Sequence, residues 1–150
     1  MDPEKIAQAL ERHSLVALDS CVLIYLLEGH AQFGPAARIV LERIAEGKNE
    51  AVASTLVLLE VQVGAYGKRA AALAEAYYAA LGKWPHLRWI PMTYAIADRA
   101  ARLRAEHKFK VADAIHLATA QEMAAGLFVT NDVELPAIAG LEYLILGRIA

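Results

Sequence analysis

Short apolar runs alternate along the chain with longer segments in which apolar residues recur every three or four positions. The short runs predict strands, and the longer segments predict helices. The expected strands cover residues 15–18, 50–53, 87–90, 127–129 and 143–146. The expected helices cover residues 3–12, 20–27, 34–46, 55–65, 68–81, 94–107 and 111–125. This alternation indicates an α/β fold with a central parallel sheet and helices on both of its faces.

Polar residues follow three of the expected strands directly. Asp19 follows the first strand, Ser54 follows the second, and the fourth is followed by Thr130, Asn131 and Asp132. Open parallel sheets bind ligands beyond the carboxyl ends of their strands, at the point where the strand order reverses. We therefore expect Asp19 at the end of the central strand, with later carboxylates folded back beside it.

Two further acids lie within apolar helical segments. Glu60 lies in residues 56–61, and Asp113 lies in residues 111–117. A helix that is apolar nearly all round is expected to be buried, and a buried carboxylate needs a partner. The sequence brings no lysine or arginine near Glu60 before Lys68. A metal ion or another site residue would supply the missing partner.

The bulk composition limits the class of protein. A chain of 150 residues with 57% hydrophobic residues forms a real core, fits one domain over residues 1–150, and is not disordered. Its apolar runs are too short to span a membrane, and the single Cys21 excludes an internal disulfide or a multi-cysteine zinc site. We expect a cytoplasmic protein without membrane association. The net charge of −2 means that any nucleic-acid role depends on local features.

Four carboxylates that converge without a cation would repel one another, and some would keep a proton at neutral pH. Mg²⁺ and Mn²⁺ remove this conflict, because both are hard cations that take carboxylate oxygens and retain several waters. Two such ions about 3.5–4 Å apart can activate water and stabilise the leaving oxygen of a phosphodiester. The acids therefore favour metal-dependent chemistry on a phosphodiester.

Four segments, taken in order, resemble the PIN-domain ribonucleases, and in particular the VapC-type toxins of VapBC toxin–antitoxin pairs. These segments are residues 18–25 (LDSCVLIY), Ser54 with Glu60, residues 112–120 (ADAIHLATA) and residues 128–132 (FVTND). The resemblance covers most of the chain, and residues 1–13 look like an added N-terminal helix. It implies a three-layer PIN-like fold with a parallel sheet of four or five strands in the order 3-2-1-4-5.

The resemblance also implies roles for individual residues. The expected catalytic and metal-binding quartet, which would hold Mg²⁺ or Mn²⁺, consists of Asp19, Glu60, Asp113 and Asp132. The expected supporting residues are Thr130, Ser54 and Asn131. The implied activity is endoribonuclease cleavage of RNA, and the implied partners are a second copy of the chain and an antitoxin whose tail blocks the acidic groove. Cys21 departs from the polar or small residue that the family often has there.

Structural roles compete with these assignments. Asp19 or Asp113 could simply cap the helix that follows it. Asp132 with Thr130 could form an ordinary Asx turn. His116, one helical turn after Asp113, could contact substrate or orient a carboxylate, although a satisfied, half-buried histidine is the commoner case.

Other residues allow a similar choice. Cys21 is most simply a small core residue. The basic residues Arg99, Arg102, Arg104, Lys108 and Lys110 form either a solvated face or a rim that binds RNA phosphates. Four aromatic residues favour core or dimer contacts over base stacking: Tyr66, Tyr77, Tyr78 and Trp84.

Two other functions compete with the nuclease. One is a non-catalytic PIN-like module that binds RNA or protein. The other is a phosphatase with an aspartyl nucleophile, which is disfavoured because Cys21 stands where its second aspartate is needed. A metal titration separates the enzyme from the binding module.

Overall fold

The computed structural model describes residues 1–149 and contains a five-stranded sheet in the order β3-β2-β1-β4-β5. The strands are β1 (Leu15–Leu18), β2 (Glu50–Ser54), β3 (Leu87–Ile90), β4 (Leu127–Thr130) and β5 (Glu142–Ile145). All neighbouring strands are parallel. The expected strand order is confirmed, and β1 is the central strand. Ala150, the last residue of the expected domain, lies outside the described residues.

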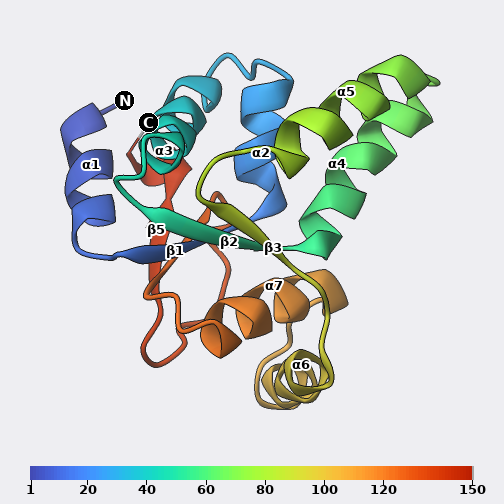
Figure 1. Ribbon diagram of the computed structural model, residues 1–150. Helices are drawn as coiled ribbons and strands as arrows, with labels where there is room; N and C mark the ends of the chain where they lie inside the picture. The colour runs from blue at the N-terminus through green and yellow to red at the C-terminus, as the bar shows by residue number, and fades with distance from the viewer. Residues whose placement is uncertain (150) are drawn as a thin grey trace.

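Helices cover both faces of the sheet (Figure 1). The helices are α1 (Pro3–Glu11), α2 (Ser20–Leu27), α3 (Gly34–Ala45), α4 (Thr55–Gly67), α5 (Ala71–Gly82), α6 (Tyr94–Glu106) and α7 (Val111–Glu122), and a short 3₁₀ helix, η1 (Leu146–Arg148), follows β5. Helices α1 to α5 contribute to the core on one face, whereas α6 and α7 pack on the other. The three-layer α/β arrangement is therefore confirmed. None of the described helices combines the length and apolarity that a membrane crossing requires.

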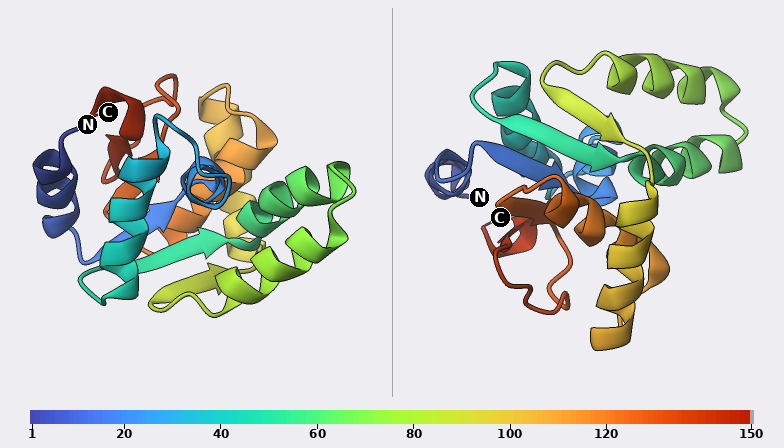
Figure 2. Two further views of the ribbon diagram at one scale, coloured as in Figure 1. Left: turned by 90° about the horizontal axis from the view of Figure 1, so that it is seen from above. Right: turned by 60° about the horizontal axis from the view of Figure 1, so that its bottom comes forward.

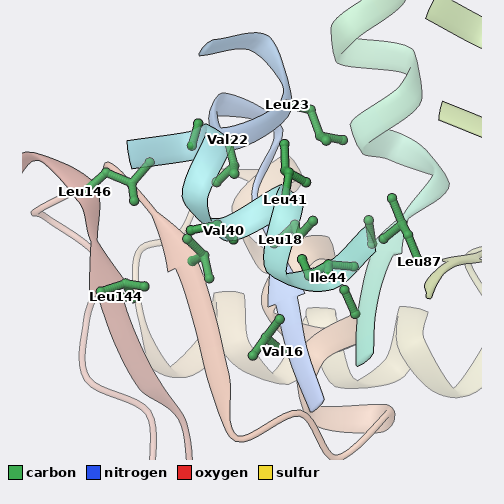
Figure 3. Close-up of a cluster of buried hydrophobic side chains, with 14 of the residues drawn as sticks. Val16, Leu18, Val22, Leu23, Val40, Leu41, Ile44, Leu87, Leu144 and Leu146 are labelled. Atoms are coloured by element: carbon green, nitrogen blue, oxygen red, sulfur yellow. The ribbon is translucent and has the colours of Figure 1, made fainter. Parts of the chain in front are cut away.

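The residues before Asp19 form a rigid support for it. Because side chains alternate across a strand, Val16 and Leu18 enter the core on the α2 and α3 side, and Ala17 enters the core beneath α7. Figure 3 shows Val16 and Leu18 among side chains of α2 and α3, including Val22 and Val40. Asp19 thus follows a strand that is packed on both faces.

Helices α4 and α5 form a hairpin that extends away from the end of β2 (Figure 2). The expectation that the helix carrying Glu60 is buried all round is wrong. Only the stripe Val57, Val61 and Ala65 is buried in α4, whereas Leu59, Val63 and Tyr66 are each more than half exposed. The reason is that this hairpin extends beyond the sheet, so one side of α4 has no covering layer.

Two helix boundaries differ from the expected ones because of left-handed residues. Arg69 has φ +53° after α4, and Ala70 N–H donates back to Ala65 O, so α5 begins at Ala71 rather than at residue 68. Ala124 has φ +58°, and α7 therefore ends at Glu122 rather than at residue 125. Both turns use a left-handed residue that is not glycine, which removes the usual sequence mark of a helix end.

Candidate functional site

Asp19 lies where the strand order reverses between β1 and β4. Its backbone N–H donates to Val129 O at 3.0 Å, across the two central strands. Its Oδ1 accepts from Ser20 N–H at 2.8 Å, which caps α2, and its Oδ2 accepts from Thr130 Oγ1 at 2.6 Å. Asp19 therefore both caps α2 and lies at the end of the central strand, as each of the two interpretations of the sequence expected.

Thr130 links Asp19 to the loop that carries Asp132. The fully buried Thr130 hydroxyl donates to Asp19 and accepts from Asp132 N–H at 3.1 Å. Asp132 Oδ1 in turn accepts from Glu134 N–H at 2.8 Å. Asp132 thus occupies the Asx-type turn considered from the sequence, and Thr130 holds this turn beside Asp19.

Asp113 lies in the first turn of α7 and close to both of these acids. Its pKa is raised by burial and by the negative charges of Asp19 and Asp132. The N-cap of α7 is Lys110, so Asp113 is not the capping residue of its helix. Among residues 1–149, no lysine or arginine forms an ion pair with any of these three aspartates. The negative charges of Asp19 and Asp132 therefore act on Asp113, and the smaller effects of the charges of His116 and Lys110 offset them only in part.

Glu60 has a protein partner that the sequence did not reveal. Its Oε1 lies 2.5 Å from His116 Nε2, and its Oε2 accepts from Ser20 Oγ at 3.3 Å. The hydrogen bond from His116 lowers the pKa of Glu60. Ser20 Oγ also lies 3.5 Å from Asp19 Oδ1, so this hydroxyl connects Glu60 to the aspartates.

His116 is buried beneath the site and orients Glu60 from α7. Its Nδ1 has no hydrogen-bond partner in the described part of the chain. This favours the tautomer with its proton on Nε2, because a buried N–H without an acceptor costs more than an unused lone pair. His116 therefore donates to Glu60, which is the carboxylate-orienting role considered from the sequence.

Ser20 is the residue that sequence reasoning missed. The only sign of its role was its place at the first helical position, directly after Asp19. Its contact partner Glu60 lies 40 positions further along the chain. That contact depends on how α2 and α4 pack, which the sequence pattern does not give.

Two of the expected supporting residues make their hydrogen bonds elsewhere. Ser54 Oγ accepts from Leu56 N–H at 3.1 Å and caps α4. Asn131 Nδ2 donates to the Tyr25 hydroxyl at 3.0 Å, and its Oδ1 accepts from Gly147 N–H at 2.7 Å. Asn131 thus links the loop after β4 to α2 and η1. Of the three expected supporting residues, only Thr130 has a side chain that hydrogen-bonds to an acid of the quartet.

Cys21 packs beside the site as a neutral thiol. Burial, together with the charge of Asp19, raises its pKa to about 12. Because thiolates rather than thiols bind metals and attack substrates, this residue contributes no reactive group at neutral pH. Its partial burial against the core agrees with a small apolar role.

The donor set fits a hard divalent cation. Within residues 1–149, no three side chains of His, Cys, Asp or Glu are close enough together to enclose a metal ion. Mg²⁺ and Mn²⁺ do not need such an enclosure, since they bind through one or two carboxylates and keep their waters. The oxygen donors of Asp19, Asp113 and Asp132 match this chemistry, and so do the burial and the neighbouring negative charges that raise the pKa of Asp113.

Residues 16–141 match the sequence model of the PIN domain family. The chain belongs to the PIN domain family. The matched range contains the whole acidic quartet and leaves out α1, β5 and η1. A search of curated proteins finds no significant match.

Solved structures similar to this PIN domain include chains of toxin–antitoxin complexes. A chain of the toxin–antitoxin complex from Klebsiella pneumoniae is 28% identical, with a TM-score of 0.66 over 84% of this chain and 94% of that chain. A chain of VapBC2 from Rickettsia felis, bound to a promoter DNA fragment, is 19% identical, with a TM-score of 0.71 over 87% and 98% of the two chains. The sarcin–ricin-loop-cleaving toxin VapC20 from Mycobacterium tuberculosis is 17% identical, with a TM-score of 0.59 over 75% and 86%. Because the last two chains are only 19% and 17% identical to this chain, their similarity shows a shared fold alone.

Proposed function

We propose that this PIN domain is a metal-dependent endoribonuclease and the toxin of a toxin–antitoxin pair. The observation that carries the proposal is the gathering of three carboxylates, Asp19, Asp113 and Asp132, with no ion-paired lysine or arginine within residues 1–149, at the point where the strand order reverses. The structural similarity to toxin–antitoxin complexes and to an RNA-cleaving toxin supports the same conclusion. The proposed RNA substrate also implies a cytoplasmic location.

The residues of the quartet take different parts in this proposal. The aspartates would hold Mg²⁺ or Mn²⁺, with Thr130 fixing the position of Asp19. When bound, such an ion would activate water and stabilise the charge that develops on a phosphodiester. The hydrogen bond from His116 lowers the pKa of Glu60, which favours its ionised form, and Glu60 completes the acidic surface.

A basic residue for substrate binding lies beside the acids. Lys110 is near enough to Asp113 for its charge to act on that carboxyl group. In contrast, Arg99 is paired with Glu122 and Arg102 with Asp98 on the exposed face of α6. We therefore assign Lys110, rather than Arg99 or Arg102, to an RNA phosphate next to the site.

The proposed homodimer uses an apolar surface formed by residues of α4, of α7 and of the segment from Met92 into α6. Leu59, Met92 and Val111 are each more than half exposed, and Tyr94 is almost fully exposed. Two shallow cavities share Met92 and Ile115, and they extend to Leu59 on one side and to Val111 on the other. Contiguous exposed apolar surface of this kind marks interaction sites. A second copy on this surface would flank the acidic site.

RNA cleavage by purified variants tests the nuclease proposal. Asp19→Asn, Asp113→Asn and excess EDTA should each abolish cleavage of a fluorescent RNA. Asp98→Asn, an exposed acid on α6, serves as the matched control and should cleave normally. Cleavage that survives both the aspartate substitutions and EDTA would contradict the proposal.

A manganese titration separates the enzyme from a non-catalytic binding module. Stoichiometric stabilisation of the folded chain by Mn²⁺, lost in Asp113→Asn, supports the enzyme through mass action.

The antitoxin is tested by coexpression with any small protein encoded beside this chain. Copurification of the two proteins with inhibited cleavage supports the toxin role, and separate elution with full cleavage contradicts it.

A further inference from the structure

A separate cavity lies between α1 and β5, built entirely from residues outside the PIN-family match. Its volume is about 280 Å³, and every lining residue precedes residue 13 or follows residue 141. The polar lining comprises Lys5, Gln8, Arg12, Glu142 and Arg148. Both ends of the described chain meet here, since Asp2 N–H donates to Ile149 O at 3.0 Å, and Figures 1 and 2 show the termini close together.

One wall of this cavity is the outer edge of the sheet. In the described sheet, β5 pairs only with β4, and Glu142 N–H donates to Gly126 O at 3.0 Å on that side. Backbone groups of successive strand residues point to opposite sides, so the N–H groups of Tyr143 and Ile145 and the carbonyl of Tyr143 point away from β4. Both residues line the cavity. This edge can therefore hydrogen-bond an extended chain.

The rim of the cavity is basic. Lys5, Arg12 and Arg148 are exposed there, and Glu142 is the only carboxylate in the lining. Glu142 is already bound by two cationic side chains, because Arg12 contacts its Oε1 and His13 Nε2 lies 2.8 Å from its Oε2. Lys5 Nζ also lies 3.4 Å from Asp2 Oδ2, in an exposed pair, whereas Arg148 forms no ion pair within residues 1–149. The three cations outnumber the two carboxylates, so an incoming chain meets a net positive charge beside a free strand edge.

We propose that this cavity binds an extended acidic peptide segment of a partner protein, which adds to β5 as a sixth strand. The backbone of the segment would pair with Tyr143 and Ile145, and its carboxylates would lie against Lys5 and Arg148. A peptide fits better than RNA, because a peptide backbone offers N–H and C=O groups at the spacing of the N–H and C=O groups on β5, whereas the phosphates of an RNA backbone only accept hydrogen bonds. This site goes beyond the proposed nuclease and does not depend on it.

A hexapeptide that alternates glutamate and valine, labelled with a fluorophore, is the probe. It should bind the full chain, measured by anisotropy, and should slow amide hydrogen exchange at Tyr143 and Ile145. Two versions N-methylated at alternate amides, one in each register, test the backbone pairing. One version should bind about tenfold more weakly than the other, because only one set of amides faces β5.

Charge reversal tests the basic rim. The double variant Lys5→Glu/Arg148→Glu should bind the glutamate peptide about tenfold more weakly and should prefer a lysine–valine peptide. Lys83→Glu/Arg88→Glu, at the β3 end of the sheet, is the matched control and should bind the glutamate peptide normally. Thermal unfolding of each variant establishes that it is folded before binding is measured.

Three outcomes would overturn the proposal. These are the absence of peptide binding, equal binding of both N-methylated peptides, and displacement of the peptide by a single-stranded RNA that perturbs the Tyr143 and Ile145 amides. The last outcome would identify a phosphate site instead. RNA cleavage, measured in parallel, should be the same for the Lys5/Arg148 variant and the unsubstituted chain, which keeps this test separate from the nuclease test.

Discussion

His116 Nε2 lies 2.5 Å from Glu60 Oε1, and this contact joins α7 to α4 beside the three aspartates. Glu60 is part of the expected quartet, and His116 is buried in the helix that carries Asp113. The histidine supplies the partner that a partly buried carboxylate requires. Glu60 is thereby held in one orientation without a bound metal.

Replacing this histidine should affect both activity and stability. His116→Phe keeps a ring of similar size but removes the donor to Glu60, so RNA cleavage should fall. The free energy of unfolding should fall by about 1–3 kcal/mol, measured by urea denaturation, because Glu60 loses its partner. His107→Phe, whose ring contacts Phe109 at its edge, is the control and should change stability by less than about 0.5 kcal/mol. Full cleavage by His116→Phe would exclude an orienting role.

Removing the Thr130 hydroxyl should weaken the metal site. Thr130→Val deletes the donor that fixes Asp19 and the acceptor for Asp132 N–H. Losses of about 10–100-fold in activity or metal affinity are typical when a residue that orients a metal ligand is changed. Thr119→Val, which removes a buried hydroxyl bound to Ile115 O, is the control, and cleavage rates of both variants are compared. Equal losses would mean that Thr130 acts only through stability.

Neutralising Asp113 should not destabilise the metal-free chain. Burial and the charges of Asp19 and Asp132 raise the pKa of Asp113, so ionisation of this residue destabilises the folded chain. In EDTA at neutral pH, Asp113→Asn should leave the melting temperature unchanged or raise it by up to about 3 °C. The difference should vanish in acid, below the pKa that Asp113 has in the unfolded chain. There the aspartate is protonated in both the folded and the unfolded chain and is as neutral as asparagine. A clear loss of stability at neutral pH would instead make Asp113 a structural residue.

The ion pairs of Glu142 should give a second pH dependence with the opposite sign. The hydrogen bond from His13, followed by that from Arg12, lowers the pKa of Glu142 from its ordinary value of 4.5. Its contribution to stability is therefore present above that value and is lost as pH falls through the lower, folded-state pKa. Glu142→Gln should melt earlier than the unsubstituted chain at neutral pH and equally in strong acid. Because Glu142 is partly exposed, the effect should be below about 1 kcal/mol.

A control for this pH dependence is available on α3. Glu42→Gln removes an exposed carboxylate that lies 3.6 Å from Arg38. Its melting temperature should follow that of the unsubstituted chain at both pH values, measured by differential scanning calorimetry. A matching shift in Glu42→Gln would show that the response belongs to net charge rather than to the contacts of Glu142.

A charge placed on the apolar surface that contains Leu59 and Met92 should prevent dimer formation. Leu59→Lys should shift the chain from dimer to monomer in analytical ultracentrifugation, because a lysine cannot be buried there without a partner. Leu73→Lys, on the outer helix α5, is the matched control and should remain dimeric. A dimer that persists in Leu59→Lys, or a monomer in the unsubstituted chain, would contradict the proposed interface.

The sequence predicted the sheet and the placement of Asp19 well, because these depend on local apolar runs and on the polar residues that follow them. It did not predict the contact between Glu60 and His116, which are 56 positions apart and meet only through the packing of α4 against α7. It also did not predict the direction of Asn131, whose side chain follows the loop geometry toward Tyr25. Side-chain contacts between distant elements are therefore the part of the site that requires a structure.

The capping bond from Asp19 to the start of α2 has a practical consequence for trapping substrates. An inactive protein is often used to capture an uncleaved RNA, and any proposed metal ligand could be chosen to make it. Asp19→Ala would also remove a helix cap, at a typical cost of about 1 kcal/mol, and both Asp19→Ala and Asp19→Asn would remove the carboxylate oxygen that accepts from Thr130. Asp113 is not the N-cap of α7, so Asp113→Asn should give an inactive trap that keeps the hydrogen bonds of Asp19 intact.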